Sequence, residues 1–109
     1  MPQYMLQFAY TSEAWGALSR KPVDRTKGIE SLAESLGGKL ISLHYTMGDY
    51  DGQAVLEAPN DVTAMAMVIR AIGPGHLRST KTTRLFTPQE AMKAMKKAGA
   101  GTYRAPADK

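Results

Sequence analysis

A five-residue turn, GDYDG at residues 48–52, limits the folds open to this chain more than any other feature. Strand-like runs flank it, with LISLHYTM at 40–47 before the turn and QAVLEAP at 53–59 after it. Gly48 permits a positive φ, and aspartate side chains bond nearby backbone amides, so the chain can reverse here within a few residues. The segment therefore predicts an antiparallel hairpin.

Further strands and helices follow from periodicity and capping residues. Residues 3–10 alternate between an apolar and a more polar set, which predicts a strand with one apolar face, and a last strand is expected over 78–86. Helical spacing of apolar residues predicts helices over 13–19, 22–36, 62–72 and 88–98. Their expected starting residues are Thr11 or Ser12, Pro22, the pair Asn60–Asp61, and a capping box formed by Thr87 and Glu90.

The resulting order is β-α-β-β-α-β followed by a terminal helix, which is the ferredoxin-like arrangement of the α+β class. A four-stranded antiparallel sheet would carry helices on one face and leave the other face to water, a ligand or a partner chain. The helix over 62–72 is apolar nearly all round, which predicts a second buried face. Residues 1–98 are expected to form one domain, and residues 99–109 a flexible C-terminal tail.

Composition narrows the classes of function. The chain is 43 % hydrophobic and 22 % charged, as in water-soluble domains, and no apolar run approaches the roughly 18 residues that a membrane span needs. It contains no cysteine, which excludes disulfides, thiolate metal sites and a cysteine nucleophile, and fits a reducing compartment. We therefore expect a cytoplasmic protein without a membrane partner. We predict no metal site, although two histidines leave a histidine–carboxylate site open.

Strand alternation predicts which side chains face the helices and which lie on the open face. The helix side is expected to hold Tyr4, Leu6, Phe8, Ala54, Leu56 and Ala58, joined by Ile41, Leu43 and Leu85. The open face would hold Gln3, Met5, Gln7, Ser42, His44, Gln53, Val55, Glu57, Thr82, Arg84 and Phe86. This mixture of amide, acidic, basic and apolar groups is typical of a polar pocket.

His44 is the candidate catalytic residue, because an imidazole can act as an acid or a base near neutral pH. Glu57 and Arg84 would orient it or bind an anion, and Gln7 would contribute from the adjacent first strand. These ligand-binding candidates are expected to meet in a polar cavity on the open face. The alternative is that His44 belongs to a hydrogen-bond network at a subunit interface.

Two aromatic residues outside that face are further ligand-binding candidates. Trp15 would form a wall of a pocket mouth, or else cover one end of the core. Tyr50 would form a pocket lip or pack on a partner subunit, or else the turn serves only to fix the hairpin register. Open-face positions on the inner strands carry no aromatic residues, which argues against the base stacking of RNA-binding modules of this fold.

The stretch GGKLISLHYTMGDYDGQAVLEAPND at 37–61, then an Ala/Met-rich helix, then TTRLFTPQEA at 82–91, resembles the GYD domain family. The resemblance covers roughly residues 4–95. One departure is Gly52-Gln53, which replaces the usual apolar residues after Tyr-Asp. The family is similar to dimeric α/β-barrel proteins, in which two ferredoxin-like sheets face each other. The resemblance implies self-association, but it supplies no assigned activity and no catalytic residues.

Three functional hypotheses follow. The first is a small homo-oligomer that binds a small organic molecule in a polar cavity between sheets. The second, implied by the resemblance, is a dimeric α/β-barrel enzyme of monooxygenase or isomerase type. The third is a structural or regulatory interaction module. The sequence names no cofactor and leaves open whether the protein is an enzyme.

Overall fold

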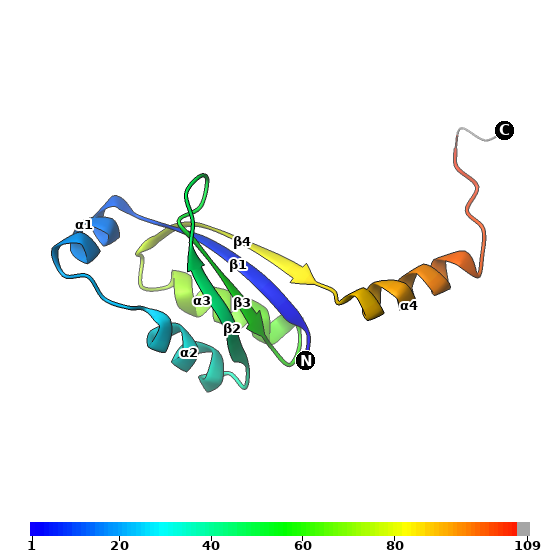
Figure 1. Cartoon of the computed structure of the whole chain (residues 1–109), viewed down its shortest axis with the longest axis horizontal. Coiled ribbons are helices and arrows are strands. Elements are labelled where there is room, and N and C mark those ends of the chain that lie inside the picture. Colours follow the sequence, from blue (N-terminus) through cyan, green and yellow to red (C-terminus); the bar gives the residue numbers. More distant parts are fainter. Residues whose placement is uncertain (107–109) are drawn as a thin grey trace.

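The computed structural model describes residues 1–106 of the chain. Four strands and four helices follow one another in an α+β arrangement (Figure 1). In chain order these are β1 (Gln3–Tyr10), α1 (Ser12–Arg20), α2 (Thr26–Ser35), β2 (Lys39–Tyr45), β3 (Gly52–Glu57), α3 (Asp61–Ile72), β4 (Leu77–Leu85) and α4 (Pro88–Gly99). No helix within residues 1–106 combines the length and the hydropathy that crossing a membrane requires.

The strands form one antiparallel sheet in the order β2-β3-β1-β4. The long β1 lies between β3 and β4, where Met5 pairs with Val55 on one side and Thr83 on the other. Helices α2 and α3 cover one face of this sheet (Figure 1). The predicted hairpin and the ferredoxin-like fold are therefore confirmed.

The core lies between these helices and the sheet. Burial alternates along β3 and along residues 3–8 of β1, whereas Ala9 and Tyr10 are both buried. Tyr4, Leu6, Phe8, Ala54 and Leu56 point into the core, as the sequence predicts. Small side chains in this core let the helices approach the sheet closely; they are Ala33, Ala54, Ala58 and Ala64. Met67 fills the space that remains at the centre of the core. Every side chain next to these in β1 and β3 lies on the opposite face.

The helix starts match the predicted caps except at α2. Thr11 caps α1, and the Thr87–Glu90 capping box of α4 is complete. Pro22, however, was expected in the first turn of α2 and lies outside it. The Asp24 carboxylate instead accepts hydrogen bonds from the amide and hydroxyl of Thr26. These bonds fix a turn, so that α2 begins only at Thr26.

The face predicted for β4 is wrong. Arg84 pairs with Tyr4 and therefore points to the helix side, whereas Leu85 pairs with Gln3 and lies on the open face. Thr82 moves to the helix side with Arg84. A one-residue change of register exchanges the two faces of a strand, and the polar sequence of β4 has no apolar alternation to fix it.

A smaller correction applies to β2. Its ladder with β3 has an irregularity between Leu40 and Ser42. Ile41 lies at this irregularity and is largely exposed, while Leu40 packs against the core in its place. The bulge explains the difference, because one extra residue shifts the alternation of the strand on its N-terminal side.

Helix α4 extends away from the rest of the molecule (Figure 1). None of its side chains is buried. The radius of gyration is 17.9 Å and the longest extent is 62 Å, whereas a compact chain of this length has a radius of gyration of roughly 13 Å. The packed body thus ends near Leu85. Part of the predicted tail, residues 107–109, lies outside the described residues.

Candidate functional site

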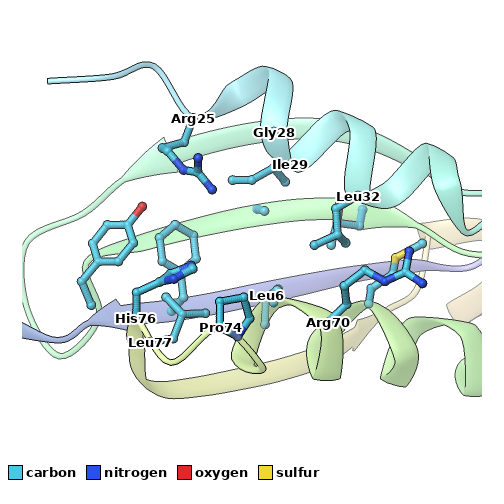
Figure 2. Close-up of a pocket in the computed structure, with 15 residues that line it drawn as sticks. Leu6, Arg25, Gly28, Ile29, Leu32, Arg70, Pro74, His76 and Leu77 are labelled. Carbon is cyan, nitrogen blue, oxygen red and sulfur yellow. The ribbon is translucent and has the colours of Figure 1, made fainter. Parts of the chain in front are cut away.

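A cavity of about 150 Å³ lies between α2, α3 and the helix-facing side of the sheet (Figure 2). Its lining comes from five elements and from the loop after α3. The lining residues are Leu6, Phe8, Tyr10, Arg25, Gly28, Ile29, Leu32, Ala54, Leu56, Met67, Arg70, Ala71, Pro74, His76 and Leu77. The walls are therefore mostly aliphatic and aromatic, with a few polar groups.

Three nitrogen-bearing side chains stand around this cavity: Arg25, Arg70 and His76 (Figure 2). Arg25 precedes α2 and is half-buried, Arg70 lies in the last turn of α3, and His76 lies in the loop that leads to β4. The Arg70 Nη1 atom donates a hydrogen bond to Ser35 Oγ at 2.8 Å. Both arginines keep further guanidinium donors for a ligand.

The electrostatic setting favours an anion. Among the described residues that line the cavity, none is acidic. Within residues 1–106 the one ion pair joins Arg84 to Glu90, and neither of these residues lines the cavity. Guanidinium groups beside an apolar wall that carries no acidic side chain attract a carboxylate or a phosphate.

Tyr10 adds a neutral polar group to the cavity wall. Its side chain is buried, and its Oη atom lies 3.2 Å from the Oη atom of Tyr45. Burial is the main cause that raises the pKa of the Tyr10 hydroxyl above its ordinary value, and the hydrogen bond with Tyr45 adds to it. The hydroxyl therefore stays protonated at neutral pH and can donate or accept a hydrogen bond.

The GDYDG turn ties three elements together beside this wall. One carboxylate oxygen of Asp51 accepts bonds from the Tyr10 amide at 2.8 Å and from the Trp15 Nε1 atom at 3.1 Å. The Asp51 carbonyl accepts a bond from the Thr46 amide, which closes the hairpin. Gly48 has φ 129°, a conformation that other residues rarely adopt. Asp51 thus fastens α1 and the end of β1 to the hairpin.

Comparison with known families places the chain. Residues 4–95, which are most of the chain, match the sequence pattern of the GYD domain family.

The chain belongs to the GYD domain family.

Solved structures of similar fold share little sequence with this GYD domain. MtbAldR matches with a TM-score of 0.56 and 13 % identity, covering 79 % of this chain and 52 % of that one, so the GYD domain spans about half of MtbAldR. TTHA0845 from Thermus thermophilus matches with a TM-score of 0.52 and 14 % identity, covering 80 % and 95 %. FFRP-DM1 matches with a TM-score of 0.50 and 13 % identity, covering 79 % and 100 %.

At these identities the likeness shows the fold alone. No curated protein matches the sequence of this GYD domain. The functional argument therefore depends on the geometry of its own residues.

An aromatic cluster connects the GYD turn to the cavity. Five neighbouring ring pairs formed by Phe8, Tyr10, Trp15 and Tyr45 have centroids 5.1–6.4 Å apart, and three of these pairs are edge to face. Phe8 and Tyr10 also line the cavity, whereas Trp15 borders a separate shallow hollow beside Tyr45. Tyr50 is half-buried in the turn, and its carbonyl accepts a bond from Thr46 Oγ1. A ligand-binding role for Trp15 or Tyr50 stays a prediction.

The site predicted on the open face does not converge. His44 is exposed and pairs with Gln53, which pairs in turn with Gln7, so these three share one row across the sheet. Glu57 shares their face but lies four residues from Gln53 along β3, or about 13 Å. Its carboxylate accepts a bond from the Gln3 amide at 3.4 Å instead.

Arg84 lies on the other face of the sheet, so the predicted meeting of His44, Glu57 and Arg84 is wrong. Its guanidinium carbon stands 5.6 Å from the Tyr4 ring centroid and 4.4 Å from that of Phe86. An arginine is tolerated there because β4 is an edge strand, and its long side chain can stack on rings while the charge reaches water. Individual roles for His44, Gln7, Glu57 and Arg84 stay predictions.

Sequence reasoning missed the cavity residues Arg25, Arg70 and His76. They lie before α2, at the end of α3 and in a loop, so no single motif joins them. The available signal was a set of basic residues at helix ends that lack acidic neighbours one turn away. Within residues 1–106 no group of three or more His, Cys, Asp and Glu side chains is placed to hold a metal ion.

Proposed function

We propose that this GYD domain binds a small organic anion in the cavity between α2, α3 and the sheet. The observation that carries the proposal is an apolar cavity bordered by Arg25, Arg70 and His76, with no acidic group among its described lining residues. The ligand would place an apolar body against the core and its anionic group among these nitrogens. This site replaces the polar cavity expected on the open face.

The cavity volume limits the ligand size. Drug-sized ligands occupy pockets of roughly 300–1,000 Å³. An apolar cavity near 150 Å³ accepts a molecule about as large as benzene. A carboxylate with one ring, or with a short branched chain, fits both the volume and the charge.

Benzoate and benzyl alcohol are suitable probes because they share a ring and differ in charge. We expect titration calorimetry to detect benzoate binding and weaker binding of benzyl alcohol. Arg25→Gln should weaken benzoate binding by about tenfold or more, since a hydrogen bond to a charged group contributes roughly 1.5–3 kcal/mol. The same substitution should change benzyl alcohol binding little.

Arg78→Gln is the matched control, because Arg78 is exposed on β4 and does not line the cavity. Its affinity for benzoate should equal that of the unaltered protein. Equal losses from Arg25→Gln and Arg78→Gln would show that only the overall positive charge matters. The absence of benzoate binding at millimolar concentration would contradict the proposal outright.

We also propose that the open sheet face pairs with that of a second copy, as in a dimeric α/β barrel. Its central row, Ser42-Val55-Met5-Thr83, places two apolar side chains where α2 and α3 give no cover. Val55→Lys should remove this contact and halve the mass of the assembly in light scattering. Thr82→Lys, on the other face of the sheet, is the control and should leave the mass unchanged.

Catalysis is the second candidate function. The observation that favours it is that Tyr10 and His76, whose side chains can exchange protons, line the cavity. A role for His44 as catalytic acid or base remains a prediction, as does a cytoplasmic location. A purely structural or regulatory module is the outcome if neither benzoate nor any other small anion binds.

A further inference from the structure

Helix α3 carries an apolar stripe on its outer side, away from the core. Val62, Met65, Ile69 and Ile72 are between 41 % and 79 % exposed. Their spacing of three, four and three residues is that of a coiled-coil seam, which places all four on one narrow line along the helix. The stripe is therefore a ready surface for a second helix.

Helix α4 carries a matching stripe. Met92 and Met95 are 54 % and 67 % exposed, and Ala91 and Ala98 lie beside them at helical spacing. Both helices have 12 residues, so each is about 18 Å long. The small alanines on either side of the methionines let another helix approach closely.

We propose that α4 of one copy of this chain packs antiparallel on the α3 stripe of a second copy, and that the second copy returns the contact. The charges at the helix ends fix the direction. Asp61 opens α3 and Arg70 lies in its last turn. Glu90 opens α4, and lysines 96 and 97 lie in its last turn. Antiparallel packing sets each acid against a base at both ends.

Packing of α4 on its own α3 is disfavoured by the topology. Leu85 and Glu57 both pair with Gln3, so β4 ends at the same end of the sheet where α3 begins. If α4 folded back there, it would run parallel to α3. Glu90 would then meet Asp61, and the α4 lysines would meet Arg70. A second copy avoids this repulsion, and a mutual exchange closes as a two-fold dimer.

The apolar stripes of this contact lie outside the proposed ligand site and the open sheet face, and Arg70 is the one residue that the contact shares with the ligand site. Helix α3 covers the face of the sheet opposite the open one (Figure 1), and its stripe residues are exposed. If benzoate does not bind, the proposed exchange of α4 still stands. If α4 is not exchanged, the proposed ligand site still stands.

The absence of cysteine allows a direct test by disulfide formation. Antiparallel packing brings residue 65 of one copy opposite residue 95 of the other, within the range that a disulfide spans. Mixing Met65→Cys with Met95→Cys protein under mild oxidation should give a cross-linked heterodimer as the main product. Mixing Met47→Cys, which lies exposed in the hairpin loop, with Met95→Cys is the control and should give little.

The opposite geometry has its own signature. Parallel folding back would bring residues 69 and 95 of one chain together, so the double variant Ile69→Cys/Met95→Cys would close within a monomer. That product would overturn the proposal, as would the absence of the heterodimer from the first mixture.

An equilibrium measurement gives a second check. Met95→Glu should weaken self-association by about tenfold or more, because it removes an apolar side chain from each copy of the contact. Met47→Glu makes the same chemical change away from α4 and should leave association unchanged. Circular dichroism would establish that both variants keep their fold. Equal association constants for the two variants would also refute the proposal.

Discussion

Replacement of Asp51 by alanine tests whether the GYD turn holds the end of the sheet together. The Asp51 carboxylate accepts the Tyr10 amide at 2.8 Å, at the irregularity where the β1–β4 ladder shifts between Ala9 and Tyr10. It also accepts the Trp15 indole at 3.1 Å. Asp51→Ala removes both bonds and leaves the Tyr10 amide without this acceptor.

The expected loss follows from those two bonds. A partly buried amide left without an acceptor costs about 1–3 kcal/mol, and the bond from the more exposed Trp15 contributes less than that. We expect the free energy of unfolding to fall by about 2–3 kcal/mol, with a fall in Tm of about 10 °C. Asp51→Asn should lose less, because its amide oxygen can still accept both bonds without the charge.

Urea unfolding followed by fluorescence is a suited assay, since Trp15 is the one tryptophan of the chain. Asp49→Ala is the matched control within the same turn, because Asp49 is exposed and no side-chain hydrogen bond of it is seen among the described residues. Asp51→Ala should also shift the native emission as α1 loosens. If both alanine variants lose the same stability, the role given to Asp51 is refuted.

Other predictions address the glycines and the buried tyrosine. Gly52→Ala should cost about 1–3 kcal/mol in urea unfolding, since its Cβ atom would lie 2.4–3.0 Å from carbons of the Phe8 ring, and Phe8→Leu should recover part of the loss; no loss would contradict the packing. Gly28→Leu should abolish benzoate binding because the leucine side chain fills the cavity, and it should not lower Tm because leucine favours helix. The control variant Gly16→Leu should bind benzoate normally. Retained benzoate binding by Gly28→Leu would argue against this cavity. Burial raises the pKa of Tyr10, so the folded state keeps a proton that the unfolded state releases near pH 10, and stability should fall as pH rises from about 10. Tyr10→Phe should reduce that slope, and an unchanged slope would contradict the burial of the hydroxyl.

The sequence predicts those parts of the fold where side-chain patterns are strong. In β1, aromatic residues and leucine alternate with a more polar set that includes two glutamines, so the helix-facing side is unambiguous. The Thr87–Glu90 capping box and the GDYDG turn are local signals, and both form as predicted. Burial and local hydrogen bonding act here in the same direction.

The candidate site is harder to predict from the sequence, because it depends on features that have no local sequence pattern. In β4 the sequence RSTKTTRLF offers polar residues at both alternations, so tertiary register alone decides that Arg84 faces the helices. The turn at Asp24 sets where α2 begins and thus where Arg25 stands. The cavity itself arises from the packing of two helices, which no spacing along the chain encodes.

The methyl signals of the seven methionines provide the most direct test of ligand binding in the cavity. Met67 lines the cavity, Met5 lies on the open sheet face, and Met95 lies on the outward α4. In a benzoate titration followed by methionine-methyl NMR, we predict that the Met67 signal shifts progressively to saturation. The signals of Met5 and Met95 should stay in place. A saturable shift of Met5 with Met67 unchanged would put the site on the open face and contradict the account.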